Sequence, residues 1–314
     1  MSTNATLATA VAPVEKNADR AHRLQLVCGY VLAVALIASL VVYGFDYYTL
    51  SNAERPFSSK HVLLKPSGTI GVKLGFLGMA MFFAIFLYPL RKISPWLSRQ
   101  GNSRHWLDIH VLLGLSAPFV IAFHSAFKFR GFAGMAFWIM MAVSLSGMIG
   151  RYLFAQIPRG LNAAELSMKE LQDVQDKLAQ QLAQQNLLPQ ADLRALLNFP
   201  SPERVARLSI VFALGYMMAL DLARYFLVAK LRRHTLSPRE SLTTMGGLLS
   251  TRHRTLEKAI TAAREEAATA KRGLFLARAQ QVFHLWHVVH KPFSYTFALL
   301  AVIHILVVMM MGFF

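Results

Sequence analysis

The sequence contains a single cysteine, Cys28, among its 314 residues. One cysteine excludes an internal disulfide, a CxxC redox pair, a four-cysteine cluster site and a CxxCH haem attachment. The chain also lacks a GxGxxG or Walker-type glycine-rich loop, so nothing in it indicates a flavin or nucleotide domain. Any redox cofactor would therefore be held by side chains other than cysteine.

Charged residues are scarce, at 16% of the chain, whereas a soluble domain carries about a quarter. Acidic residues are the scarcer kind, with 16 Asp and Glu against 33 Lys and Arg, while 55% of the residues are hydrophobic. The cations cluster between apolar segments, as in cytoplasmic loops of membrane proteins, and not along an aromatic groove for nucleic acid. The composition thus indicates a membrane protein and no nucleic-acid partner.

Four apolar segments predict membrane-spanning helices within residues 24–155. The first runs from Leu24 to about Val42 and ends in tyrosines, not at a small-residue cleavage site, so we interpret it as uncleaved. The others cover 69–90, 106–127 and 132–154, each about 22 residues and enough to cross a bilayer. Residues 1–23 form a polar segment that we expect to be disordered or at the surface. The loop 91–104 has four cations and no acid, which favours the cytoplasm.

Residues 156–280 form a predicted helical insertion. Residues 163–186 have helical apolar spacing and predict either an amphipathic surface helix or a docking helix for a partner. Residues 208–229 are apolar but contain Asp221 and Arg224, three apart on one helical face, so this segment spans, re-enters or lies at the interface. The region 230–280, with eleven Lys and Arg against four Glu, favours the cytoplasm, and its Ser237–Glu240 sequence has the form of a capping box.

The last predicted span covers 281–314, and Pro292 is expected to kink it. The fold class predicted is therefore an all-α, polytopic transmembrane helix bundle of five or six spans with a largely helical cytoplasmic insertion. Five spans are slightly favoured, because a cytoplasmic 230–280 region leaves 208–229 on one side of the membrane.

Four histidines lie in two predicted spans at matched spacing. His110 and His124 are in the third span, His290 and His304 are in the last, and fourteen residues separate each pair. Fourteen steps of about 100° end about 40° short of four turns, so both imidazoles share one face, about 21 Å apart along the axis. Two such helices face to face would present two opposed imidazole pairs, and each pair could ligate one haem iron. A proton relay or metal pathway is the alternative explanation.

Which histidines would pair depends on the helix directions. Parallel helices, expected with five spans, pair His110 with His290 and His124 with His304. Antiparallel helices, expected with six, pair His110 with His304 and His124 with His290. His287 is the runner-up ligand, because its seventeen-residue separation from His304 places it about 100° off the shared face.

Several neighbouring residues fit such a site by type alone. Small side chains between the histidines would leave room for a flat macrocycle; they are Gly114, Ser116, Ala117, Pro118, Ser294, Thr296 and Ala298. Interfacial cations are candidate partners of haem propionates; they are Arg104, Arg130 and Arg151, with Lys128 and Lys291. His105 and His284 are expected near the membrane edge, beside propionates or a quinone. Four histidines in polar segments are expected at the surface; they are His22, His61, His234 and His253.

With its segments HVLLGLSAPFVIAFH from His110 and HKPFSYTFALLAVIH from His290, the chain resembles the dihaem membrane cytochromes b, in particular the ferric-reductase-like transmembrane group. The HLWHVVHKP sequence before the last span is also similar to the final helix of bacterial respiratory cytochrome b subunits. The resemblance covers the third, fourth and last spans but not residues 156–280. The sequence shows no flavin and nucleotide domain such as ferric reductases append, which argues against direct reduction by NADPH.

The resemblance implies transmembrane electron transfer through two bis-histidine b-type haems, in a multi-pass protein of the bacterial inner membrane. It implies a cytochrome b subunit of a respiratory quinone-linked complex, not a complete enzyme. The expected partners are membrane lipid, a quinone and peripheral or periplasmic redox subunits. The alternative is a histidine-lined proton or metal-ion transporter without haem. A purely structural anchor would explain the helices but not the histidines.

Overall fold

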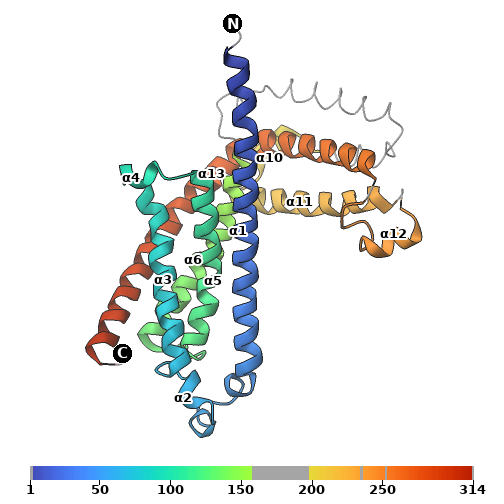
Figure 1. Cartoon of the computed structure of the whole chain (residues 1–314). Coiled ribbons are helices and arrows are strands. Elements are labelled where there is room, and N and C mark those ends of the chain that lie inside the picture. Colours follow the sequence, from blue (N-terminus) through green and yellow to red (C-terminus); the bar gives the residue numbers. More distant parts are fainter. Residues whose placement is uncertain (1–2, 158–197, 234–235, 252, 313–314) are drawn as a thin grey trace. The chain divides into compact units, whose positions relative to one another are not determined.

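The computed structural model describes residues 3–157, 198–233, 236–251 and 253–312 (Figure 1). The described residues form helices and no strands, which confirms the predicted all-α class. The helices are α1 Thr3–Tyr48, η1 Arg55–Phe57, α2 His61–Leu64, α3 Thr69–Arg91, α4 Pro95–Ser98, α5 Ser103–His124, α6 Gly131–Gln156, α10 Pro202–Arg207, α11 Ile210–Arg233, α12 Pro238–Thr243 and α13 Arg254–Met310.

Six helical segments of the described chain are long and apolar enough to cross a membrane. They are Arg20–Tyr48, His61–Arg91, Ser103–His124, Gly131–Gln156, Ile210–Arg233 and Leu256–Met310. Their outward surfaces expose large apolar side chains such as Leu32, Val42 and Phe212, each at least 69% exposed. In water such surfaces would be unfavourable, whereas lipid tails are a suitable solvent for them. The chain is accordingly a multi-pass membrane protein.

The chain divides into two compact units. Unit 1 comprises residues 1–151 and 289–314, and unit 2 comprises residues 152–288. Both units use part of α13, because this helix begins in unit 2 and ends in unit 1. All four predicted ligand histidines belong to unit 1, whereas the runner-up His287 belongs to unit 2.

The core of unit 1 lies between α1, α3 and α5, with α3 and α5 side by side (Figure 1). Glycines on α3 allow the close approach of α5. A Cβ on Gly75 would lie 2.8 Å from Cε1 of His124, and a Cβ on Gly78 would collide with the Ile121 side chain. Small residues at a contact let two membrane helices pack closely, and here they bring α3 against the histidine-bearing helix.

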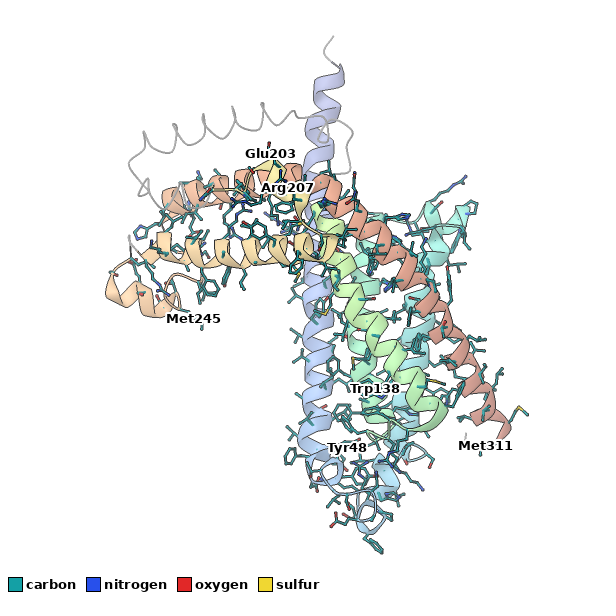
Figure 2. All side chains as sticks on the ribbon, turned by 180° about the vertical axis from the view of Figure 1, so that it is seen from behind. Tyr48, Trp138, Glu203, Arg207, Met245 and Met311 are labelled. Carbon is teal, nitrogen blue, oxygen red and sulfur yellow. The ribbon has the colours of Figure 1, made fainter. Side chains whose placement is uncertain are left out.

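The contacts of α6 define the direction of the last part of α13. His290 of α13 contacts Ser146, whereas Phe297, about two turns later, packs in the cluster that includes Met140. Advancing along α13 therefore means going backwards along α6, so the two run antiparallel. Since α6 is itself antiparallel to α5, the final part of α13 runs parallel to α5. Figure 2 agrees, because Tyr48, at the end of α1, and Met311, after α13, lie toward the same end of unit 1.

The parallel directions of α5 and the last part of α13 limit the number of membrane crossings in the chain between α6 and residue 289. The chain leaves unit 1 at the end of α6 and returns at residue 289 on the same side of the bundle, so the chain between them crosses an even number of times. A single crossing by α11 is incompatible with this count. The helix directions in unit 1 thus favour the five-span alternative, although α11 is long enough to span.

Unit 2 is built around a helical hairpin of α11 and the first part of α13, which lie side by side in both views (Figures 1 and 2). Its core includes Leu231 and Ile260, both almost fully buried. Arg232 donates hydrogen bonds to the Glu257 carboxylate at 2.8 and 2.9 Å and links the two helices. The predicted capping box is present: the Ser237 N–H bonds Glu240 Oε2 at 3.1 Å, and the Glu240 N–H bonds Ser237 Oγ at 3.4 Å.

Several predicted boundaries were wrong. Helix α1 begins at Thr3, so the N-terminal segment is helical, not disordered. Helix α13 begins at Arg254, not near 281, because the alanine-rich stretch before the apolar part carries no proline and favours helix. Pro292, expected to kink the last span, lies inside α13. The predicted amphipathic helix at 163–186 lies outside the described residues.

Candidate functional site: two histidine pairs in the helix bundle

His110 is oriented by a carbonyl group that a proline has freed. In an α-helix, the carbonyl of Ile85 would accept a hydrogen bond from the N–H of residue 89, but Pro89 has no N–H. The Nδ1 of His110 lies 2.9 Å from this carbonyl oxygen. Because a carbonyl can only accept, the proton must be on Nδ1, so the lone pair of the neutral ring is on Nε2.

His124 is also held by a backbone carbonyl of α3, near the start of that helix. Its Nδ1 lies 2.8 Å from the carbonyl oxygen of Gly71, so its proton is on Nδ1 as well. The missing side chain of Gly75 makes the space for the ring. Helix α3 therefore provides both acceptors that orient the two histidines of α5.

His290 obtains its acceptor from α6. Its Nδ1 lies 2.7 Å from Ser146 Oγ, and the Ser146 hydroxyl donates its proton to the Val143 carbonyl at 2.9 Å. The Ser146 hydroxyl thus contacts both the Val143 carbonyl and the His290 ring. His110 and His124 thus have a protonated Nδ1, and their Nε2 is the atom that can bind a metal ion, while the Nδ1 of His290 is engaged by a hydroxyl.

The helix directions group these histidines into two pairs at two depths. His124 and His304 are close enough for an electrostatic interaction at one end of unit 1. His110 and His290 belong to the other end, because each lies about 21 Å back along a parallel helix. This is the pairing expected for five spans.

Space beside Gly114 lies between the two depths. A Cβ on Gly114 would meet nothing within 4 Å. Gly114 is four residues after His110, so it is on the same face of α5. Its carbonyl, which Pro118 leaves without a helical donor, accepts a hydrogen bond from Ser144 Oγ at 2.8 Å, so α6 supports the backbone here. A flat group could approach α5 at this position.

Two lysines at the His110 end of unit 1 were not predicted as a pair. Burial and the nearby Lys291 ammonium lower the pKa of Lys92. The Lys92 ammonium also lies 4.9 Å from the centre of the Tyr88 ring, which in turn is 5.2 Å from the His110 ring. Two neighbouring cations next to a histidine pair favour an anionic group between them. Both lysines lie near residues of the candidate site in the sequence. Lys92 is three residues after Pro89, which frees the carbonyl that His110 contacts, and Lys291 directly follows His290.

The arginines predicted as propionate partners differ in their surroundings. Arg151 makes an ion pair with Asp108, 2.7 Å from its Oδ1, so a protein carboxylate already balances its charge. Arg104 and Arg130 lie exposed in and before the first turns of α5 and α6. These assignments stay predictions, and the two lysines are better placed.

One other histidine differs from its predicted environment. His22, expected at the surface, is 8% exposed; its ring stacks on His105 at 3.7 Å, and its Nε2 lies 3.3 Å from Asp108 Oδ2. The Nδ1 of His287 contacts the Phe283 carbonyl of its own helix at 3.0 Å. His287 belongs to unit 2 and keeps its place as the runner-up.

Comparison with protein-family models, with curated proteins and with solved structures gives no match for this chain. The geometry of unit 1 therefore stands alone as the basis for a functional conclusion.

Proposed function

We propose that this protein carries electrons across a membrane through two b-type haems, each held by two histidines. The observation that carries the proposal is that the Nδ1 atoms of His110, His124 and His290 are all engaged by polar groups of unit 1, which leaves Nε2 as the ligand atom of each ring. Metal-binding histidines typically donate their other N–H to a carbonyl or hydroxyl, which fixes the ring orientation and raises the basicity of the ligand.

The proposed ligands are His110 with His290 for one haem and His124 with His304 for the other. Two histidine ligands on each iron would leave no open coordination position, so the group would supply one-electron transfer and not oxygen activation. The open space beside Gly114 and the small residues of α5 would admit the macrocycle. Lys92 and Lys291 would bind propionates at the His110 end. A membrane-spanning pair of haems would connect redox partners on opposite sides of the bilayer.

The charge pattern suggests the orientation. The loop 91–104, with four cations and no acid, would face the cytoplasm of a bacterial inner membrane. The chain leaves α6 on that same side, which agrees with the basic region 230–280 being cytoplasmic. A quinone pool and a peripheral or periplasmic redox subunit are the proposed partners. The protein would act as the electron-transfer subunit of a respiratory complex.

Haem content tests the proposal directly. Protein made in haem-replete cells should contain two haem b per chain by pyridine haemochrome, and its reduced-minus-oxidised spectrum should show a b-type α-band. A quinol should reduce it in membranes that contain its partners. Folded protein without haem would refute the proposal and favour the histidine-lined transporter, which proton or metal uptake into liposomes would then reveal.

Replacement of Pro89 by Ala should weaken one haem selectively. The new N–H at position 89 would bond the Ile85 carbonyl within α3 and compete with His110 Nδ1. Losing such a supporting hydrogen bond typically lowers metal-site affinity by about 10-fold to 100-fold. Haem transfer to apomyoglobin should accordingly be faster for one haem and unchanged for the other.

The matched control is Pro95→Ala, because Pro95 is exposed at the first position of α4, where its missing N–H serves no ligand. Unchanged transfer rates in Pro89→Ala would show that the freed carbonyl does not orient a ligand. Equal acceleration for both haems would point to a general loss of packing.

A further inference from the structure

Unit 2 contains a charged cluster that the described residues of this unit do not balance. The Asp221 carboxylate lies 2.5 Å from the Lys271 ammonium and accepts a hydrogen bond from the Tyr152 hydroxyl at 2.7 Å. The sequence suggested Arg224 as the partner of Asp221, but Lys271, only 2% exposed, takes that place. One carboxylate is thus matched by one buried ammonium.

Arg224 adds a second cation without a second acid. Its guanidinium carbon lies 4.4 Å from the centre of the Phe199 ring, which is a cation–π contact. Both terminal nitrogens are buried, and neither has a hydrogen-bond partner among the described residues. These two nitrogens carry four N–H donors that the surrounding described residues do not satisfy. Leaving buried donors and a charge unpaired is costly, so a missing anionic partner is indicated.

Further positive charge surrounds the cluster. Arg224 and Arg272 both act electrostatically on Lys271. Counting Asp221, Lys271 and Arg224, the site has a net charge of +1 before the exposed Arg272 is included. Among the described residues, the Tyr152 hydroxyl and the Asp221 carboxylate contact this cluster, and they are hydrogen-bonded to each other. The cluster would gain from one additional anion.

We propose that Arg224 and Lys271 form a binding site for a phosphate group. The guanidinium fork fits two phosphate oxygens, and Lys271 adds a second positive charge to the cluster. Residues next to Arg224 on α11 are large, apolar and 47–61% exposed: Leu222, Tyr225 and Phe226. Such a surface suits lipid acyl chains, and basic sites between membrane helices bind anionic lipid headgroups. The proposal is independent of the haems.

The binding event requires one side-chain movement. Arg224 as a whole is half-buried, so its aliphatic stem is accessible while its terminal nitrogens are covered. Rotation about the stem would move the guanidinium from the Phe199 ring to the phosphate. The cation–π contact is the resting state, and two charge-assisted hydrogen bonds would replace it.

Thermal unfolding of the full-length protein tests the site. The wild type, Arg224→Met and Arg264→Met would be compared in phosphate-free detergent, with added inorganic phosphate, and in nanodiscs of phosphatidylcholine with and without phosphatidylglycerol. Arg264 is the matched control, because it is an exposed arginine of α13 in the same unit. At saturation, phosphate or phosphatidylglycerol should raise the apparent Tm of the wild type by about 5 °C, and the control should respond equally.

The Arg224→Met protein should lose this response and retain one phosphatidylglycerol fewer by native mass spectrometry. In phosphate-free detergent it should be at least as stable as the wild type, because it lacks an unpaired buried charge. A response to inorganic phosphate identifies a free anion, whereas a response to phosphatidylglycerol alone identifies a lipid headgroup. No response of the wild type to either ligand, or an equal response in Arg224→Met, would overturn the proposal.

Discussion

Removal of any one proposed axial ligand should leave the purified protein with one haem b per chain in place of two. The four substitutions are His110→Ala, His124→Ala, His290→Ala and His304→Ala. Each would leave one iron with a single imidazole, and noncovalent haem with one ligand is lost during purification. Pyridine haemochrome measures the remaining haem, and His287→Ala, on the same helix as two of the ligands, should keep both.

Double substitutions distinguish the two pairings. Because the last part of α13 runs parallel to α5, His110 and His290 should serve one haem, and their double variant should keep the other. The double variant of His110 and His304 should lose both haems. The reverse result would mean that the two helices present their histidines in antiparallel order. Two haems in all four single variants would contradict bis-histidine ligation altogether.

Replacement of Gly114 by Leu should abolish binding of at least one haem without unfolding the protein. In the structure the space beside this glycine is open, so a larger side chain meets no protein atom at its Cβ. Leucine is also a better helix former than glycine by about 1 kcal/mol, which favours the folded state. If a macrocycle uses this space, the added side chain would collide with it. The variant should therefore lose haem while its helical circular dichroism and elution profile remain normal.

Gly215→Leu is the control for the effect of leucine in place of glycine. Gly215 lies in α11 of unit 2, and a Cβ there also meets nothing within 4 Å. This variant should keep two haems. If Gly114→Leu also keeps both, the macrocycle does not approach α5 at this position, and the haem must contact other residues. Loss of folded protein in both variants would make glycine itself, and not haem, the requirement.

Patterns local in the sequence predicted most of the helices well. The second, third and fourth predicted spans match α3, α5 and α6 within about four residues, because long apolar runs and their flanking charges are local signals. The capping box at Ser237 also depends on residues only three apart. The start of α13 was missed because the polar alanine-rich turns before the apolar segment continue the same helix. Apolarity marks where a chain can cross a membrane, not where a helix begins.

The candidate site shows the same division. The fourteen-residue spacing places His110 and His124 on one face of a helix through backbone geometry alone, and likewise His290 and His304. The acceptor of His110 could have been inferred from Pro89, since proline always frees a carbonyl four residues earlier. Which ring would use that carbonyl could not, because His110 and Ile85 are 25 residues apart. Packing of α3 against α5 decides that contact.

The sequence alone therefore predicted a polytopic helical membrane protein in which two helices each carry two histidines on one face. The tertiary structure decided which histidines of the two helices lie at the same depth and which carbonyls contact their rings. It also decided that Lys271, not Arg224, neutralises Asp221. Helix periodicity and apolarity act between residues a few positions apart, so they can be recognised in a single chain. Pairing across helices depends on their direction and packing, which arise only when distant segments come together in the fold.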